Sequence, residues 1–579
     1  MNRYFFKITI RRLTNRGVFQ IINILGLSIG LAVVLLISLL IFNEQSFDKQ
    51  FKESGNIYRI NCNLTAYRAG ETWCGVGNAA GPAYKEAIPE ILTAVRTAKR
   101  DFVIKINDNP IRVEVVIADE DFFKLFETPF LSGSPETALS RPNTVAISKE
   151  MAKRLFGTEN PIGETFLVEN QVQVEVAAVY QDYPKNSSFW GHKIIVPITT
   201  FIGSNTSWMN GAYETFCLLP EKVDTAQVGA KMRKITLDAN DGWWWYHPYL
   251  QRLEEMHLHS AKFIGSYTSS QSDIEKVKMM SLLAVIILVV ACINYMNLST
   301  ARAQKRSREI GISKTVGAKR YELITRLFFE TGILTFISFL VAFLLAALLL
   351  PVFNNLLGEQ LDFGSAFRPL FLGVAFLIWL ATTVFAASYP AIYMSGFPPL
   401  LAIRSGGFMP KSSHAVVRKV LSVGQFAVAV VLIAWVLIIQ AQISFMNDKD
   451  LGYNYSKLMY ISPGRSAWQT DMEPLVNDFR AESSVEMVSR RSPGGSFFSG
   501  NNVTIAKSSE DHVGLSVTMQ AVDPNFFDVM QIKLIAGRLL PEGRPGDSIT
   551  QVILNRAAVE YIGMTPEEVL GKKTILFAF

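Results

Sequence analysis

Charge is scarce in this sequence, and long stretches of it carry none. Charged residues make up 18% of the 579 residues, whereas apolar residues make up 49%. Five runs lack Asp, Glu, Lys and Arg over more than the roughly 18 residues that predict a membrane-spanning helix. These runs are 17–43, 279–301, 331–358, 369–403 and 420–447. The imbalance predicts a membrane protein with sizeable soluble parts.

Cysteine is rare as well, with four residues in the chain and no C-x-x-C spacing. Neither a zinc site nor a disulfide framework is therefore indicated. Cys62 and Cys74 would lie outside the membrane and could pair, which would leave Cys217 over, whereas Cys292 falls in an apolar run. The sequence leaves open whether Cys62 and Cys74 form a disulfide.

Catalytic motifs are missing too. Gly571-Lys572-Lys573-Thr574 resembles part of a phosphate-binding loop, but Pro566 stands where that loop needs its first glycine. No nucleophile elbow occurs, and the uncharged runs hold no ionisable relay for ion-coupled transport. The sequence thus predicts no enzymatic activity and no cofactor, so that ATP would be hydrolysed by another polypeptide.

Two clusters have competing interpretations. Three histidines gather near two glutamates, namely His247, His257 and His259 near Glu254 and Glu255. They form either a metal site or, as we expect, a polar surface before a membrane stalk. The run Trp243-Trp244-Trp245-Tyr246 is expected in a domain core or interface. The alternatives for it are a path for an apolar substrate and an aromatic belt at headgroup level.

Basic residues flank the apolar runs and predict the side of the membrane on which each loop lies. Seven Lys or Arg residues fall within 302–320, and at about 2.5–3.5 kcal/mol each they would cost roughly 20 kcal/mol inside a bilayer. Because such loops stay in the cytoplasm, a coupling segment over 302–326 is placed there. A basic amphipathic helix over 1–20 and a linker over 395–419 lie on the same side. The predicted spans are 21–43, 279–301, 327–352, 369–394 and 420–443.

The remaining regions, 44–277 and 444–579, contain no spanning run and are predicted to lie outside the membrane. Alternating residues at 102–106 and 111–117 around an Asn-Asp-Asn-Pro turn predict a hairpin. Further elements are predicted at 144–148 (strand), 149–156 (helix, ended by Gly157) and 171–180 (strand). The predicted fold class is a membrane α-helical bundle of five transmembrane helices with α+β extracytoplasmic domains.

The second outer region repeats the first. Ala118-Asp119-Glu120-Asp121-Phe122-Phe123 returns as Ala521-Val522-Asp523-Pro524-Asn525-Phe526-Phe527, with Asp119 matched to Asp523. Further matches follow in the same order: 131–133 with 535–537, 145–148 with 551–554, and 162–163 with 570–571. The second copy stops partway, at Phe579, so we expect a truncated gene product or a fragment.

The basic segment carries an ordered motif. Arg308-Glu309-Ile310-Gly311-Ile312, then Lys314, then Val316-Gly317-Ala318, resembles the REIGIxKxxGA motif of FtsX-like, MacB-type ABC transporter permeases. In that family the motif follows the second transmembrane helix and meets an ATPase, and the FtsX-like domain would cover 279–405 here. The resemblance implies a set of ATPase-coupling residues: Arg308, Glu309, Ile310, Gly311, Ile312, Lys314, Gly317 and Ala318.

Two interpretations of this segment remain open on its residues alone. It could be only a positively charged anchor on the cytoplasmic side. Alternatively, a short helix bounded by glycine would present Ile310, Ile312 and Val316 to a groove of a partner. The order of the motif favours the second interpretation, because an anchor does not require glycines at fixed positions.

The resemblance implies a multi-pass permease in a bacterial inner (plasma) membrane, with a cytoplasmic N-terminus. It would transmit movement from a separate ATPase subunit to MacB-like periplasmic domains, for efflux or extraction of a substrate on that side. Expected partners are the ATPase, the lipid bilayer and a periplasmic adaptor or outer-membrane component, but no nucleic acid. The alternatives are an FtsX-like signalling protein that regulates cell-wall hydrolases, and a membrane sensor without an ATPase. The duplicated architecture argues against the signalling alternative.

Overall fold

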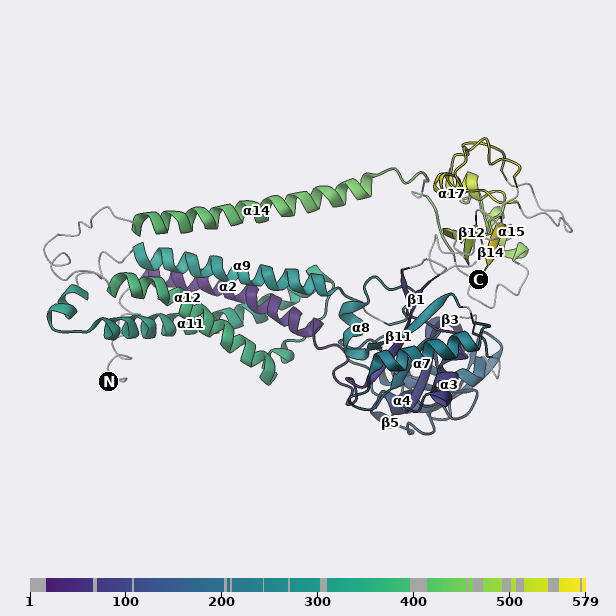
Figure 1. The fold of residues 1–579 in the computed structure, drawn as a ribbon, viewed down its shortest axis with the longest axis horizontal. Coiled ribbons are helices and arrows are strands. Elements are labelled where there is room, and N and C mark those ends of the chain that lie inside the picture. Colours follow the sequence, from purple (N-terminus) through teal and green to yellow (C-terminus); the bar gives the residue numbers. More distant parts are fainter. Residues whose placement is uncertain are drawn as a thin grey trace. The chain divides into compact units, whose positions relative to one another are not determined.

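The chain divides into two compact units in the computed structural model (Figure 1). One unit is Met1–Ser46 with Asp273–Asp448, and the other is Phe47–Ser272 with Lys449–Phe579. The structure describes residues 17–65, 70–106, 109–201, 206–208, 211–242, 244–268, 271–301, 310–395, 414–454, 457–461, 472–491, 501–506, 515–539, 551–572 and 575–578.

Among the described residues of the first unit, five helices are long and apolar enough to cross a membrane, as the uncharged runs predicted. They are α2 (Gly17–Glu44), α9 (Ile274–Ala301), α11 (Arg320–Leu357), α12 (Pro369–Ser395) and α14 (His414–Asp448). Helix α2 packs against α9 and α11, and α11 packs against α12. Leucines of α2 and alanines of its neighbours form the shared core of this bundle, and the short helix η1 (Phe363–Phe367) joins α11 to α12.

Helix α11 differs from the predicted third span, 327–352. It already begins at Arg320, where the Lys319 amide donates to Glu322 Oε2 at 2.9 Å and caps the helix. No glycine or proline occurs between Arg320 and Glu330, and Arg and Glu are good helix formers, so the helix continues from the basic segment into the apolar run. It therefore contains Glu330, a carboxylate that is only 8% exposed.

Close backbone contacts and polar bonds join the helices of the bundle. A Cβ atom on Gly30 of α2 would lie 2.7 Å from the Cβ atom of Ala291 on α9. Ser28 donates to the Ser338 carbonyl of α11 at 2.9 Å, and the hydroxyls of Thr335 and Thr383 lie 2.7 Å apart between α11 and α12. Such contacts hold helices together in lipid, where the hydrophobic effect between them is weak.

Residues 47–272 form an α+β domain. Where the structure describes them, they build one mixed sheet of eleven strands, whose main path is β11-β1-β10-β3-β4-β9-β6-β8-β5. The strands are β1 (Ile57–Leu64), β2 (Thr72–Trp73), β3 (Thr93–Ile106), β4 (Asn109–Ala118), β5 (Phe130–Ser132), β6 (Thr144–Ser148), β7 (Thr165–Val168), β8 (Val172–Tyr180), β9 (Ile194–Pro197), β10 (Glu214–Leu218) and β11 (Tyr246–Arg252). The helices are α3 (Ala80–Ala87), α4 (Phe122–Leu125), α5 (Lys149–Phe156), α6 (Ile198–Phe201), α7 (Thr225–Asp238) and α8 (Leu253–His259).

Several sequence predictions for this domain are confirmed. Strands β3 and β4 pair as an antiparallel hairpin up to Ile106 and Asn109. Helix α5 ends at Gly157, whose φ of 69° is the left-handed conformation that glycine adopts without strain. Trp244, Trp245 and Tyr246 belong to a core cluster, as expected for a domain core, while Trp243 lies outside the described residues.

The C-terminal region contains a smaller sheet with the order β13-β12-β14. Its elements are α15 (Glu473–Ala481), β12 (Asn501–Ala506), β13 (Leu515–Met519), α16 (Phe526–Met530), α17 (Arg556–Ile562) and β14 (Ile575–Ala578). The order matches that of β4-β3-β7 in the first domain. Ile505 of β12 pairs with Leu515 and Leu576, just as Ile104 of β3 pairs with Ile111 and Val168.

The matched aspartates of the sequence repeat make the same hydrogen bonds. The Arg96 amide donates to Asp119 Oδ2 at 2.8 Å, and the Asp119 amide donates back to the Arg96 carbonyl. The Arg490 amide likewise donates to Asp523 Oδ2 at 2.8 Å, and the Asp523 amide donates to the Arg490 carbonyl. The repeat is therefore visible in backbone geometry as well as in sequence.

One match of the repeat needs a correction. The sequence alignment set Ser148 against Leu554, but the structure sets it against Asn555. Ser148 caps α5 by accepting from the Met151 amide, and Asn555 caps α17 by accepting from the Ala558 amide. Both helices end at a left-handed glycine, but α17 is one residue shorter than α5. Matching the two segments without a gap therefore shifts the residues before the helix by one position.

Candidate functional site

The described part of the basic motif is a short helical turn. Residues 310–315 are helical, and Gly317, with φ of 98°, ends the helix. The Ala318 amide donates to the Ser313 carbonyl and the Gly317 amide to the Lys314 carbonyl, both at 3.0 Å. This bond pair is a Schellman cap, which needs the left-handed residue that glycine supplies. Arg308 and Glu309 of the predicted site lie outside the described residues.

The isoleucines of the motif point to different surroundings. Ile310 is 7% exposed and packs on Leu323 of α11, with Ala318 and Leu327 beside them. The expectation that Ile310 faces a partner is therefore wrong, because this side chain holds the turn against its own bundle. Ile312 and Val316 are 51% and 83% exposed, and their spacing of four residues places them on one side of the turn.

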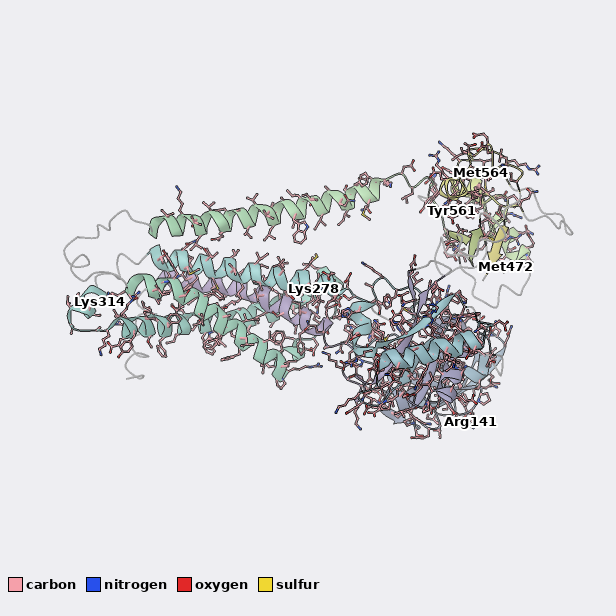
Figure 2. All side chains as sticks on the ribbon, in the orientation of Figure 1. Arg141, Lys278, Lys314, Met472, Tyr561 and Met564 are labelled. Atoms are coloured by element: carbon pink, nitrogen blue, oxygen red, sulfur yellow. The ribbon has the colours of Figure 1, made fainter. Side chains whose placement is uncertain are left out.

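Lys314 connects the turn to a second helix. Its Nζ donates to the carbonyl of Ser395, the last residue of α12, at 2.7 Å. Arg320 Nε donates to the Ser395 hydroxyl at 3.3 Å. The turn is thus bonded to α12 and packed on α11, at the end of the bundle opposite to Lys278 (Figure 2). Ser395 was not recognisable from the sequence, since it lies 81 residues from Lys314.

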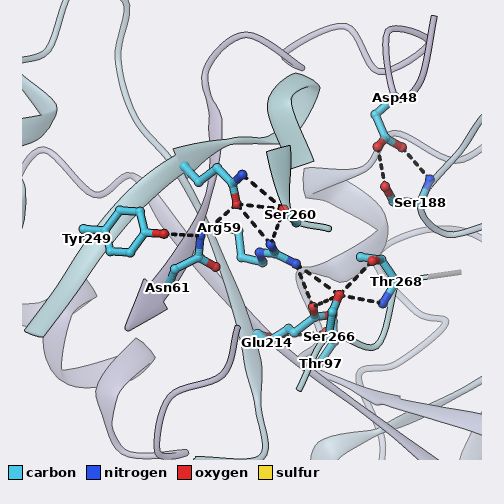
Figure 3. A network of polar contacts seen from close by, with 11 residues as sticks. Asp48, Arg59, Asn61, Thr97, Ser188, Glu214, Tyr249, Ser260, Ser266 and Thr268 are labelled. Atoms are coloured by element: carbon cyan, nitrogen blue, oxygen red, sulfur yellow. Dashed lines mark hydrogen bonds and ion pairs between the residues drawn. The ribbon is translucent and has the colours of Figure 1, made fainter. Parts of the chain in front are cut away.

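A second polar site lies inside the first outer domain, where Arg59 of β1 is fully buried (Figure 3). Its Nη1 atom donates to Glu214 Oε1 of β10 at 2.9 Å. Its Nη2 atom donates to Gln251 Oε1 of β11 and to Ser260 Oγ, both at 3.0 Å. Ser266 adds a further bond to Glu214 Oε1 at 3.0 Å. A buried guanidinium is tolerated only when its charge is matched in this way.

This network joins parts of the chain that follow and precede membrane spans. Arg59 lies in the first strand after α2, whereas Ser260 and Ser266 lie in the segment that leads into α9. Burial raises the pKa of Glu214, and the Arg59 guanidinium opposes that rise. Displacing β1 would separate the buried Arg59–Glu214 ion pair. Displacing the segment before α9 would remove the Ser260 bond to Arg59 and the Ser266 bond to Glu214, so the network resists independent movement of the two connections.

Asp48 makes a second buried connection close to the end of α2. Its carboxylate accepts from the Ser188 amide at 2.8 Å, from the Ser188 hydroxyl at 2.6 Å and from the Ser187 hydroxyl at 3.2 Å. Burial raises the pKa of Asp48 to about 6, and the serine bonds oppose this rise. Neither Asp48 nor Arg59 stood out in the sequence, where each is one polar residue in a mixed segment.

The structure shows the surroundings of the cysteines and of the histidine cluster. All four cysteines, which the structure describes, are free thiols and buried. Cys62 and Cys74 are thus unpaired here, and Cys62 Sγ donates to the Gly75 carbonyl. His257 is buried, with its ring stacked 3.4 Å from that of Phe47. Within the described ranges, no group of three or more His, Cys, Asp or Glu could hold a metal ion.

Two protein families have sequence models that match this chain. The MacB-like periplasmic core domain matches residues 21–235, and the FtsX-like permease C-terminal domain matches residues 281–399. The second match contains the turn at 310–318 and the helices that it contacts. The chain belongs to the FtsX-like, MacB-type family of ABC transporter permeases, and its fold is a membrane helical bundle with an α+β MacB-like domain.

Named relatives agree with this family. Over 423 residues the chain is 25% identical to the macrolide export ATP-binding/permease protein MacB of Burkholderia orbicola, covering 68% of this chain and 54% of that protein. Over 236 residues it is 28% identical to the uncharacterized ABC transporter permease YknZ of Bacillus subtilis, covering 40% and 56%. The chain spans about half the length of these relatives.

Solved structures show weaker similarity. The periplasmic region of MacB from Actinobacillus actinomycetemcomitans matches with a TM-score of 0.27 and 11% identity, covering 34% of this chain and 89% of that chain. The extracellular domain of the ABC-type transporter YknZ from Gram-positive bacteria matches with a TM-score of 0.27 and 15% identity, covering 33% and 99%.

Proposed function

We propose that this chain is the permease subunit of an ABC transporter, and that a separate ATPase drives it by mechanotransmission. ATP-dependent closure of the ATPase would move the turn at 310–318, and the bundle would pass this movement to the outer domains. The substrate would be exported or extracted on the outer side. Since these 579 residues contain no complete phosphate-binding motif, we assign ATP hydrolysis to another polypeptide.

The observation that carries this proposal is the construction of the turn. Two apolar side chains of the turn, Ile312 and Val316, are exposed to solvent. Ile310 and Lys314 fix the turn to α11 and α12. Exposed apolar residues on a rigidly held helical turn suit a groove on a partner. A simple positively charged anchor would need neither the Schellman cap nor the bond to Ser395.

The outer domain has features that suit the receiving end of such a mechanism. The Arg59 network ties the strand after α2 to the segment before α9, so movement of either span would reach the same sheet. Switching a two-state element from 1:99 to 99:1 needs about 5.5 kcal/mol of differential binding. We further propose that 444–579 is a second MacB-like domain, which the shared strand order and the matched aspartates support.

The orientation and location follow from the same proposal. The N-terminus and the turn at 310–318 would lie in the cytoplasm, and the outer domains would lie in the periplasm of a bacterium with an inner membrane. A periplasmic adaptor or outer-membrane component remains part of this proposal, because export from the periplasm requires a further route.

The test is ATP hydrolysis in proteoliposomes that contain the chain and the ATPase that co-purifies with it. Ile312→Glu combined with Val316→Glu places two charges in the contact, and we expect stimulated hydrolysis to fall at least about tenfold, as for the loss of a central apolar contact. Thr325→Glu, at an exposed position of α11, is the control and should keep the stimulation. If the double variant keeps the wild-type thermal midpoint and still stimulates ATP hydrolysis fully, the turn does not dock the ATPase.

A further inference from the structure

The loop between β8 and β9 exposes an unusual side chain. Among residues 47–272, as far as the structure describes them, the exposed large apolar side chains are Leu92, Leu131, Ile162 and Trp190. Trp190 is the aromatic one in this group, and it is 41% exposed. The Nζ atoms of Lys185 and Lys193 each lie 5.9 Å from the centre of its ring, within the range of a cation–π contact.

The same loop is hydrogen-bonded to Asp48, a buried residue four positions after the end of α2. The Asp48 amide donates to the Asn186 carbonyl at 3.0 Å, and the Asp48 carboxylate accepts from Ser188 (Figure 3). The Trp190 amide donates to the Ser187 carbonyl at 3.1 Å. Trp190 is therefore held in a tight turn, two residues after Ser188.

Chain length alone limits how far this loop can lie from a membrane surface. Asp48 comes four residues after Glu44, the last residue of α2, and four residues reach at most about 14 Å. The candidate span Gln20–Glu44 has 25 residues and is about 37 Å long at 1.5 Å per residue. Since the hydrocarbon core is about 30 Å thick and the headgroup layers bring the total to about 40–45 Å, α2 ends within a headgroup layer.

The side chains around this position match the chemistry of that layer. Tryptophan concentrates at the membrane interface, where its ring lies among headgroups. Lys49 and Lys52 are exposed in the turn that holds Asp48, and Lys185 is exposed beside Trp190. Lys193 is bonded to Asp182 and Glu150 at 2.8 Å, so it supports the ring, whereas the other lysines are placed to meet phosphates.

We propose that Trp190, Lys185, Lys49 and Lys52 form a phospholipid contact, with the indole at headgroup level and the lysines on lipid phosphates. The ligand is the surface of the leaflet next to this domain. Such a contact would hold the domain against the membrane surface near Asp48, which is hydrogen-bonded to the loop that carries Trp190. It needs α2 to span the membrane, but it does not depend on any ATPase.

The test uses the full chain in vesicles and quenching of tryptophan emission by lipids brominated near the headgroup end of the acyl chain. The signal of Trp190 is the difference between the wild type and Trp190→Phe. We expect brominated phosphatidylcholine to reduce this difference at least about twofold. The matched control is the difference between the wild type and Trp73→Phe, a half-buried ring in the same domain, which should not change.

Other results would overturn the proposal. Quenching of the Trp190 signal by aqueous iodide but not by brominated lipid would place the ring in water. Protection from both quenchers would mean that protein covers it. Adding phosphatidylglycerol should strengthen the lipid quenching in the wild type but not in Lys49→Ala/Lys52→Ala/Lys185→Ala; an equal gain in both would overturn the role of the lysines.

Discussion

Asp48 is a carboxylate that water does not reach, and this makes its protonation part of the stability of the outer domain. Burial raises its pKa from 3.8 to about 6, and hydrogen bonds from Ser188 and Ser187 and the charge of His257 work against the rise. The folded domain therefore binds this proton more tightly than the unfolded chain does. The resulting stabilisation is complete below about pH 4 and is lost as the pH rises through about 6.

Replacing Asp48 with asparagine should remove that pH dependence. A rise of about two units corresponds to on the order of 3 kcal/mol, so Asp48→Asn should unfold at a higher temperature than the wild type near pH 7.5. Near pH 4 the two proteins should differ little, because asparagine resembles the protonated acid. The measurement is the thermal midpoint of the outer domain in detergent, followed by tryptophan emission from pH 4 to 7.5.

Other carboxylates change the dependence of the thermal midpoint on pH equally in the wild type and in Asp48→Asn. The pKa of Asp121 is lowered by its bond to Lys124, which favours stability at higher pH. The difference between wild type and variant therefore isolates Asp48. Asp101→Asn, at an exposed position of β3, is the control and should keep the wild-type slope. If Asp48→Asn keeps that slope too, the carboxylate is not the source of the pH dependence.

Single residues were the hardest part to predict from the sequence. The basic motif could be recognised because its residues are consecutive. The partners of Arg59 and Asp48, in contrast, lie 155 and 140 residues away along the chain. Ile310 was misjudged for a related reason, since its burial depends on Leu323 across a turn. Composition and spacing carry no information about such contacts.

At the scale of elements, local signals were sufficient. The Asn-Asp-Asn-Pro turn predicted the β3–β4 hairpin, and Gly157 predicted the end of α5. The span lengths followed from uncharged runs, but the start of α11 did not, because charged residues are compatible with a helix that emerges from the membrane. The contact between α2 and α9 could not be located, since Gly30 and Ala291 are far apart in sequence.

That contact leads to a prediction for the bundle. Gly30→Ala would place a methyl group 2.7 Å from the Cβ atom of Ala291, and neither group can rotate away, so we expect a loss of about 1–3 kcal/mol. Gly373→Ala in α12 has open space around the new methyl group, and it should gain up to about 1 kcal/mol from helix propensity. Thermal unfolding in detergent, followed by circular dichroism, compares the two variants. Equal midpoints would show that α2 and α9 do not pack as closely as described.

At the scale of the whole molecule, the repeat was predictable in outline. Conserved spacing around the two Phe-Phe pairs revealed it, and the paired bonds of Asp119 with Arg96 and of Asp523 with Arg490 show why those positions match. The register around Asn555 was lost because one helix is shorter by a residue. Side-chain identity alone could not detect this change, whereas the capping bonds do.

The orientation in the membrane is open to a direct test. Lys314 and Lys278 lie at opposite ends of the helical bundle (Figure 2). Val316→Cys, beside Lys314, and Glu275→Cys, one turn before Lys278, replace exposed residues. The native cysteines are buried, so an impermeant maleimide should not label them. In cells with a permeable outer membrane, we expect labelling at 275 but not at 316, because lysine and arginine keep the basic segment in the cytoplasm.

Opening the inner membrane should then expose position 316 to the reagent, which shows that the residue is reactive once it can be reached. A mobility shift on a gel with a large maleimide records each result. Labelling at 316 and protection at 275 in intact cells would show that the bundle has the opposite orientation in the membrane. The exposed pair Ile312 and Val316 would then face away from cytosolic ATP, and no ATPase could act on the turn that Lys314 and Ile310 fix to the bundle.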